Sequence, residues 1–338
     1  MTAVPTLTRW IVTAVGLATL TGCGGSGGSD ELAVIRIDGS STVFPVAEAV
    51  AEEFQLAGNN RVRVTVGLSG TGGGFKKLCR GEIDVANASR PILIEEMEKC
   101  RASGVKYLEL PIAFDAITIV VNPANDWVKS LTIDDLKKMW EPAAQGKITT
   151  WKQVRDEWPD TRLMLFGPGA DSGTFDYFTE AVAHKPKASR GDYTASEDDN
   201  VLVQGVENNK NALGYFGYAY YIGHKDRMRL LPIERPDGTA VLPSLETVLD
   251  GSYQPLSRPL FIYVKESSLQ RPEVRQFIEF YLTEGPELVK EVGFVPLPPE
   301  ATQIALEHVH NNRLGTVFGG VPEVGVTIED VLSREAKQ

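Results

Sequence analysis

The chain has 338 residues, and its 45 Asp and Glu against 34 Lys and Arg give a formal net charge of −11 at pH 7. This negative balance argues against nucleic acid and anionic lipid head groups as partners, and an anionic ligand has to be captured by local groups. The length is sufficient for two lobes with separate hydrophobic cores.

The N-terminal segment has the pattern of a secretory signal. Arg9 is the only charge before an apolar run at residues 10–20, which is too short to span a bilayer. The run ends in Leu-Thr-Gly-Cys, which resembles the lipobox of bacterial lipoproteins, in which the cysteine is acylated and the chain is cut just before it. We therefore predict a signal peptide at residues 1–22, a lipid anchor on Cys23 and a Gly/Ser tether at residues 23–32. An ordinary signal peptide with an unmodified cysteine is the alternative.

Beyond the tether, the pattern is strand and helix in alternation, which is typical of an α/β protein. Strands, of which the third is almost continuously apolar and hence buried, are predicted at residues 34–37, 61–66, 116–121, 163–166 and 258–264. Helices are predicted from Pro45 onward, from Thr132 as an N-cap through Trp140, at residues 175–183 and at residues 272–283.

Three short turns rich in Gly, Ser and Thr each lead from a strand into a helix, namely GSST at 39–42, GTGGG at 70–74 and DSGT at 171–174. A helix start offers free N–H groups and a partial positive charge, and glycine lets an anion approach the backbone closely. One such turn is an ordinary connection, but three that converge would form a cage for a small oxyanion. Hydroxyl groups that can donate to the anion belong to Ser40, Ser41, Thr42, Thr71, Ser172 and Thr174.

Nucleotide-binding motifs do not fit these turns. The Gly146-Lys147 pair is followed by Ile148, where a phosphate-binding loop of the Walker type requires Ser or Thr. The GTGGG turn fails the dinucleotide fingerprint because Phe75 occupies the position of its third glycine. The sequence therefore indicates an oxyanion cradle without a nucleotide.

Arg90 follows a predicted buried strand at residues 84–88 and stands beside the turns in this interpretation. Its guanidinium could make a bidentate contact with an oxyanion, or it could pair with a carboxylate of the protein. We favour the first, because arginine seldom follows a buried strand without a partner.

Cys79 and Cys100 remain once Cys23 is assigned to the anchor. In an exported protein two such cysteines form a disulfide more often than they remain buried free thiols. The bridge would close a loop of about 22 residues and contribute roughly 3 kcal/mol in the chain-entropy model.

Five linked motifs carry a resemblance to a known family. The chain is similar to the phosphate-binding lipoproteins of bacterial high-affinity phosphate ABC transporters, from about residue 34 to residue 318, in the segments GSSTVFPVAEAVAEEF, GLSGTGGGFKKLCRGEIDVANASRPI, AFDAITIVVNP, FGPGADSGTFDYF and NALGYFGYAYY. The resemblance implies an α/β, two-lobed periplasmic-binding-protein fold of type II (a Venus-flytrap fold) with two hinge crossings. Lobe I would comprise residues 33–114 plus 264–338 and lobe II residues 115–263.

The resemblance also implies a function. Such a protein is extracytoplasmic, is held by its lipid anchor to the cell membrane (in the periplasm or on the outer face), captures inorganic phosphate between its lobes and delivers it to the permease subunits of an ABC transporter. We expect a monomer with no cofactor, no metal and no catalytic residue. Transferred by motif, the phosphate-binding residues would be Ser41, Thr42, Val43, Thr71, Gly72, Arg90, Ser172, Gly173 and Thr174.

Two positions depart from the better-known branch of this family. An aspartate there stands at the position of Arg90, and an arginine lies just upstream of the SGT turn, where this chain has Pro168. That aspartate accepts the proton that phosphate retains at neutral pH. In this chain Asp171 is the first candidate for the acceptor and Asp115 the second, although Asp171 could instead be a plain helix cap.

Two other functions stay open at this point. A phosphoester hydrolase would use a serine or threonine of these turns together with a base or metal, but none of His184, His224, His308 and His310 lies in a glycine turn. A binding protein for another tetrahedral oxyanion, such as arsenate, sulfate or a phosphonate, would use the same cage.

Overall fold

The computed structural model describes residues 32–58, 61–321 and 323–337. The predicted signal peptide, Cys23 and all of the predicted tether except Leu32 lie outside the described residues. No helix in the described ranges combines the length and the apolar character needed to cross a membrane.

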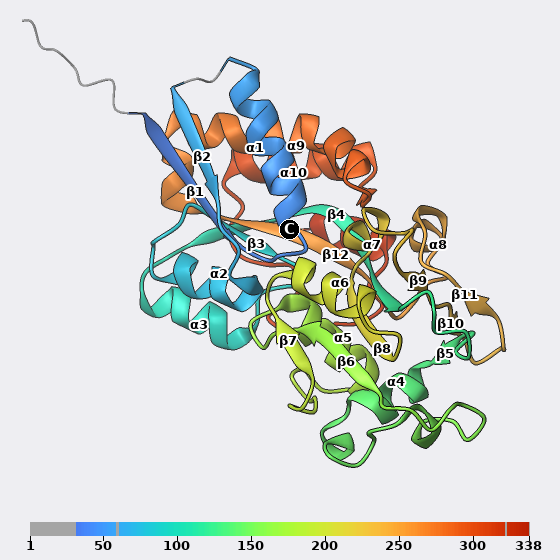
Figure 1. The fold of residues 1–338 in the computed structure, drawn as a ribbon. Coiled ribbons are helices and arrows are strands. Elements are labelled where there is room, and N and C mark those ends of the chain that lie inside the picture. The colour runs from blue at the N-terminus through green and yellow to red at the C-terminus, as the bar shows by residue number, and fades with distance from the viewer. Residues whose placement is uncertain (1–31, 59–60, 322, 338) are drawn as a thin grey trace, which may run out of the picture. The chain divides into compact units, whose positions relative to one another are not determined.

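The described residues form a mixed α/β structure (Figure 1). The strands are β1 (Ala33–Gly39), β2 (Val62–Val66), β3 (Val85–Ala88), β4 (Tyr107–Val121), β5 (Leu131–Thr132), β6 (Met164–Pro168), β7 (Thr194–Ser196), β8 (Ala212–Gly217), β9 (Arg229–Leu230), β10 (Ile233–Glu234), β11 (Ala240–Val241), β12 (Ser257–Lys265) and β13 (Val295–Pro296). The α-helices are α1 (Phe44–Leu56), α2 (Gly70–Cys79), α3 (Ile94–Ala102), α4 (Ile133–Trp140), α5 (Gly173–Ala183), α6 (Asp199–Glu207), α7 (Tyr218–Ile222), α8 (Leu245–Leu249), α9 (Pro272–Glu291), α10 (Pro299–Asn311) and α11 (Ile328–Glu335). The 3-10 helices are η1 (Pro142–Ala144), η2 (Trp151–Gln153) and η3 (Glu266–Gln270).

The main sheet has the strand order β2-β1-β3-β12-β4-β8-β6-β7, and β9 and β13 also pair with β4. The strands β1, β2 and β3 are parallel, as are β6, β7 and β8, whereas β12 runs antiparallel to both β3 and β4. The chain leaves the first group along β4 and returns to it along β12. These two strands are neighbours in the sheet and run through the middle of the structure in Figure 1.

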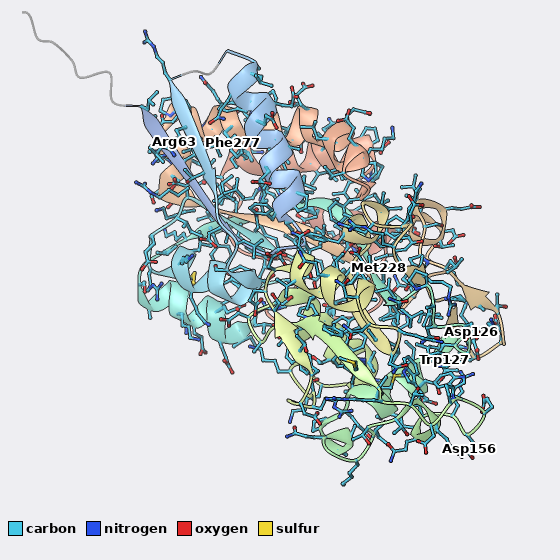
Figure 2. All side chains as sticks on the ribbon, viewed as in Figure 1. Arg63, Asp126, Trp127, Asp156, Met228 and Phe277 are labelled. Carbon is cyan, nitrogen blue, oxygen red and sulfur yellow. A yellow bond between two sulfur atoms is a disulfide. The ribbon has the colours of Figure 1, made fainter. Side chains whose placement is uncertain are left out.

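Helix α1 shows why the core forms where it does. The buried side chains of this helix, spaced so that they share one face, are Val46, Ala47, Val50, Ala51 and Phe54. The ring of Phe54 packs edge-on against Phe277 of α9 at a centroid distance of 5.2 Å. Figure 2 shows Phe277 in the layer of side chains at α1 and α9, whereas Arg63 points away from the edge strand β2.

The predicted strands and helices are present, and β4 and α9 are much longer in the structure than predicted. Strand β4 is buried throughout and begins at Tyr107, well before the predicted start at residue 116. The predicted start is too late because Glu109 and Pro111 interrupt the apolar pattern in the first half of the strand. Helix α9 continues past Pro286 to Glu291, because Val289 beyond the proline packs into the core and is only 1% exposed. Buried contacts thus override the local signals for a strand start and a helix end.

The two predicted partners, Cys79 at the end of α2 and Cys100 in α3, are joined by a disulfide. The bond ties together two helices that follow each other in the chain. The disulfide fixes the C-terminal end of α2, and the N-terminal end of the same helix lies at the GTGGG turn.

The C-terminal segment is held by hydrogen bonds to Glu109 of β4 and to Tyr177 of α5. Glu109 of β4 accepts hydrogen bonds from Tyr263 Oη, from Thr316 Oγ1 (2.6 Å) and from the backbone N–H of Val317 (3.0 Å). Farther along the segment, the N–H of Gly325 donates to Tyr177 Oη of α5 (3.0 Å). The Tyr177 hydroxyl in turn donates to the carbonyl of Ser257 at the start of β12 (2.8 Å).

Glu109 makes the stability of the protein depend on pH. Burial raises the pKa of its carboxyl from 4.5 to about 8, although the hydroxyls of Thr316 and Tyr263 act in the opposite direction. The folded state therefore keeps a proton that the unfolded chain releases near pH 4.5. The stability from this group is complete below that pH and is lost as the pH rises through about 8.

We predict that Glu109→Gln removes this part of the pH dependence. Between about pH 5 and 8 the wild type should lose up to ~1.4 kcal/mol of unfolding free energy per pH unit more than the variant, because one proton separates the two states. Denaturant unfolding at several pH values measures the difference. The exposed Glu98→Gln is the control and should follow the wild type; identical profiles for wild type and Glu109→Gln would contradict the prediction.

Candidate functional site

The three Gly/Ser/Thr turns lie next to one another, at the N-terminal ends of α1, α2 and α5. The hydroxyl oxygens of Thr42 and Thr174 are 2.9 Å apart, which joins the first turn to the third. The N–H of Gly72 donates to the carbonyl of Asp171 at 2.9 Å, which joins the second turn to the third. Three helix starts that are far apart in the sequence therefore converge.

Two of these helix starts have no side-chain cap. Neither Val43, the N-cap of α1, nor Ser69, the N-cap of α2, accepts a hydrogen bond with its side chain, whereas Ser172 caps α5 by accepting from the N–H groups of Thr174 and Phe175. At an uncapped helix start the positive end of the helix dipole can attract an anion, although the N–H groups of Phe44 and Gly72 are already bonded to the carbonyls of Ser40 and Asp171.

Glycine is required where the turns touch. Gly70 has a φ of +75°, and a Cβ there would lie 2.5 Å from the carbonyl oxygen of Asp171. A Cβ on Gly173 would lie 2.5 Å from the hydroxyl oxygens of both Ser89 and Thr71. These two hydroxyls are themselves 3.1 Å apart and hydrogen-bonded. The absence of a side chain at both positions is what allows the turns to meet.

Arg258 of β12 supplies a buried positive charge at this meeting point. Its side chain is completely buried, and its Nη2 donates to Thr174 Oγ1 (2.7 Å) and Thr42 Oγ1 (3.3 Å). The same nitrogen is 3.0 Å from a carboxylate oxygen of Asp115 in β4. In the described part of the chain, the Nε and Nη1 atoms of Arg258 have no hydrogen-bond partner. A guanidinium with free, desolvated donors is therefore available beside the helix starts.

Arg90 does not have the free guanidinium that the sequence prediction required. Its Nη1 and Nη2 donate to the two carboxylate oxygens of Glu96 (2.8 and 2.9 Å), and its Nε donates to Asp176 (2.7 Å). Burial lowers the pKa of Arg90, but the carboxylates of Glu96 and Asp176 outweigh burial and hold the pKa above its ordinary value. Arg90 is thus committed to two carboxylates of the protein, which favours a different cation for the site.

The two candidate proton acceptors are also engaged. Asp171 is 43% exposed in its side chain and pairs with Lys76 Nζ at 2.7 Å, and the cap of α5 is its neighbour Ser172. Asp115 is fully buried, and its oxygens accept from Arg258 and from the N–H of Tyr218 (3.3 Å). Burial raises the pKa of Asp115, while the charge of Arg258 opposes this shift.

The remaining predicted residues lie at the same place. Ser41, Val43, Gly72 and Ser172 are buried, and the carbonyl of Ser41 accepts a hydrogen bond from Tyr220 Oη (2.8 Å). The sequence analysis did not single out Arg258, which it placed as the first residue of a predicted apolar strand. An arginine that begins an otherwise apolar strand was the available signal. Within residues 32–58, 61–321 and 323–337, no cluster of three or more His, Cys, Asp or Glu is arranged to hold a metal ion.

Comparisons with known proteins place the chain in a family. A model of the PBP superfamily domain matches residues 24–284. The chain therefore belongs to the PBP superfamily, the periplasmic binding proteins, whose fold class was expected from the sequence.

Particular members of the superfamily are similar over most of their length. Protein SphX of Synechococcus elongatus is 52% identical over 91% of this chain and 90% of its own. Phosphate-binding protein PstS of Staphylococcus saprophyticus is 41% identical over 85% of this chain and 88% of its own. A crystal structure from Clostridium perfringens, described as a candidate phosphate ABC transporter substrate-binding protein with bound phosphate, is 29% identical, has a TM-score of 0.66 and covers 78% of this chain and 100% of its own.

The contact at Gly173 can be tested by substitution. In Gly173→Ala the added methyl group would overlap the hydroxyls of Ser89 and Thr71, so the hydrogen bond from the Gly72 N–H to the third turn should open more often. We expect hydrogen exchange at Gly72 to accelerate at least about fivefold, which corresponds to the ~1 kcal/mol lower limit for overpacking.

The matched control is Gly223→Ala, because a Cβ at Gly223 meets no atom closer than 3.9 Å. Exchange at Gly72 should be unchanged in this variant. NMR of amide exchange measures both proteins, and equal protection of Gly72 in all three would refute the packing argument.

Proposed function

We propose that the protein captures inorganic phosphate at the meeting point of α1, α2 and α5 and delivers it to the permease of an ABC transporter. The observation that carries this proposal is the buried guanidinium of Arg258, whose Nε and Nη1 have no partner in the described ranges and which contacts two of the helix starts. Leaving a charge buried and only partly compensated is expensive, and a bound anion would complete its environment.

The choice of phosphate rests on the relatives. A protein 41% identical to this chain is named a phosphate-binding protein, and the Clostridium perfringens structure contains phosphate. The relatives are binding proteins, which favours capture without chemistry on the ligand over phosphoester hydrolysis. We also propose that the protein is a monomer and acts outside the cytoplasm.

The binding residues are proposed to be those of the three turns together with the new cation. The ligand would receive hydrogen bonds from Ser41, Thr42, the backbone of Val43, Thr71, Ser172, Gly173, Thr174 and Arg258. Gly72 would line the site, because its N–H is bonded to the carbonyl of Asp171. The converging helix starts support this set, since each offers backbone donors or hydroxyls at one point.

Two lobes would close over the ligand. We assign residues 33–114 plus 264–338 to lobe I and residues 115–263 to lobe II, with crossings in β4 and β12. The path of the chain through these two strands supports the assignment. The contacts Thr42–Thr174 and Gly72–Asp171 would then belong to the closed arrangement, because they join the two lobes.

Arg258 should dominate the affinity. We predict that Arg258→Gln, combined with Asp115→Asn so that no buried carboxylate loses its partner, weakens phosphate binding roughly 10- to 150-fold, because hydrogen bonds to a charged group are lost. Isothermal titration calorimetry of the purified chain measures the affinity. Arg258→Lys should give a smaller loss, since the charge remains but the planar fork of donors does not.

Arg90→Lys is the matched control, because Arg90 is paired with Glu96 and Asp176. Its phosphate affinity should remain close to that of the wild type even where its stability falls. A large loss of affinity in Arg90→Lys together with unchanged binding in the Arg258 variants would return the role to Arg90.

The membrane anchor is proposed on the sequence pattern before Cys23. We predict that Cys23→Ser, expressed as the full chain in a bacterium, moves the protein from the membrane fraction to the soluble fraction, because the acylated residue is removed. Ser26→Ala in the tether is the control and should stay with the membrane. A Cys23→Ser protein that remains fully in the membrane fraction would contradict a lipid anchor at this residue.

A further inference from the structure

The end of the chain links the two proposed lobes. We call residues 315–321 and 323–335 the C-terminal strap. Its first part is fixed within lobe I, because the N–H of Ile94 at the start of α3 donates to the carbonyl of Gly320 at 2.9 Å. Its last part, the helix α11, packs against α10 of the same lobe. Both ends of the strap therefore belong to lobe I.

The middle of the strap lies against lobe II instead. The N–H of Gly325 donates to Tyr177 Oη of α5 at 3.0 Å. Gly325 has a φ of +80°, which glycine adopts without the strain that another residue would incur. The next residue, Val326, is buried in the same hydrophobic cluster as Tyr177 and Tyr253. The strap thus leaves lobe I, contacts lobe II and returns, which adds a third link to the two crossings in β4 and β12.

Tyr177 places this third link beside the buried cation. Its side chain is almost completely buried, and its hydroxyl donates to the carbonyl of Ser257 at 2.8 Å. The guanidinium carbon of Arg258, the next residue, lies 5.8 Å from the centre of the Tyr177 ring. A cation at this distance from an aromatic ring is attracted to it, most strongly where water is excluded. One side chain therefore contacts the cation with its ring, β12 with its hydroxyl proton and the strap with its hydroxyl oxygen.

The bond from the strap fixes the direction of the Tyr177 hydroxyl. Burial raises the pKa of Tyr177 to about 12, although the N–H of Gly325 and the charge of Arg258 act in the opposite direction. The hydroxyl therefore keeps its proton at neutral pH. When the N–H of Gly325 occupies the oxygen from one side, the proton is directed to the carbonyl of Ser257. Ser257 is completely buried, so losing this donor would be costly.

We propose that Tyr177 positions Arg258 for the anion and that the C-terminal strap acts through Tyr177, so that lobe closure and the placement of the cation depend on each other. This proposal rests on the proposed function of the site. Because both ends of the strap are fixed to lobe I, separation of the lobes breaks the bond from Gly325 to Tyr177. The support of the strand before Arg258 then weakens. The strap is thus a positioning element that acts on the ligand only through the cation.

A double-mutant cycle tests the positioning of Arg258. Tyr177→Phe keeps the ring beside the guanidinium and removes the hydroxyl. In the otherwise wild-type protein, phosphate affinity measured by calorimetry should fall at least about fivefold, which is the lower end of coupling between sites. In the background of Arg258→Gln with Asp115→Asn, the same substitution should leave the affinity nearly unchanged, because no guanidinium remains to be positioned. An equal loss in both backgrounds would show a merely structural role and overturn the proposal.

Tyr193→Phe is the matched control for the loss of a hydroxyl. The Tyr193 hydroxyl also donates to a backbone carbonyl at 2.8 Å, but this carbonyl belongs to Pro168 at the end of β6. Its removal should lower stability by a similar amount and leave phosphate affinity close to that of the wild type. A loss of affinity as large as that of Tyr177→Phe would contradict a specific role of Tyr177.

Hydrogen exchange in the wild type tests the link between the strap and closure. Because coupling between two events is reciprocal, phosphate should protect the Gly325 amide, whose bond joins the lobes. The Val317 amide is the internal reference, since its bond to Glu109 stays within lobe I. At saturating phosphate the exchange rate of Gly325 relative to Val317 should fall at least about fivefold. Stabilisation of the whole fold by the ligand slows both amides alike, so the ratio isolates the link.

The outcomes distinguish this proposal from the function on which it rests. A wild type that binds no phosphate refutes the phosphate site itself. A wild type that binds phosphate with an unchanged exchange ratio of Gly325 to Val317 refutes the role of the strap and leaves phosphate capture standing. If Tyr177→Phe does not fold, the exchange ratio of the wild type decides.

Discussion

The arrangement of the site depends on the burial of one guanidinium. Arg258 joins β12 to the start of α1 through Thr42, to the start of α5 through Thr174 and to β4 through Asp115. Removing such a charge from water costs several kcal/mol, which one carboxylate and two hydroxyls offset only in part. The structure therefore holds a buried cation that links two helix starts through its Nη2 and whose Nε and Nη1 have no partner within the described residues.

The sequence predicted the three turns because their signals are local. Gly, Ser and Thr at a strand-to-helix connection report a backbone geometry that depends on a few neighbouring residues, as at Gly70. The sequence could not tell the role of Arg90, which follows a predicted strand, from that of Arg258, which begins one. Their roles are decided by partners far along the chain, Asp176 for the first and Asp115 for the second.

The same limit applies to the fold. The strand-helix alternation was sufficient for the α/β class, but Glu109 and Pro111 hid the first half of β4. Glu109 is tolerated in this buried strand because hydroxyls of Tyr263 and Thr316 donate to its carboxyl group.

The hydroxyl of Tyr177 connects the end of the chain to the strand that carries the cation. It accepts from Gly325 and donates to Ser257, the residue before Arg258. The strand that carries the buried guanidinium is therefore braced from a segment that lies much later in the chain. A substitution near Gly325 can change the position of Arg258 without touching any residue of the three turns.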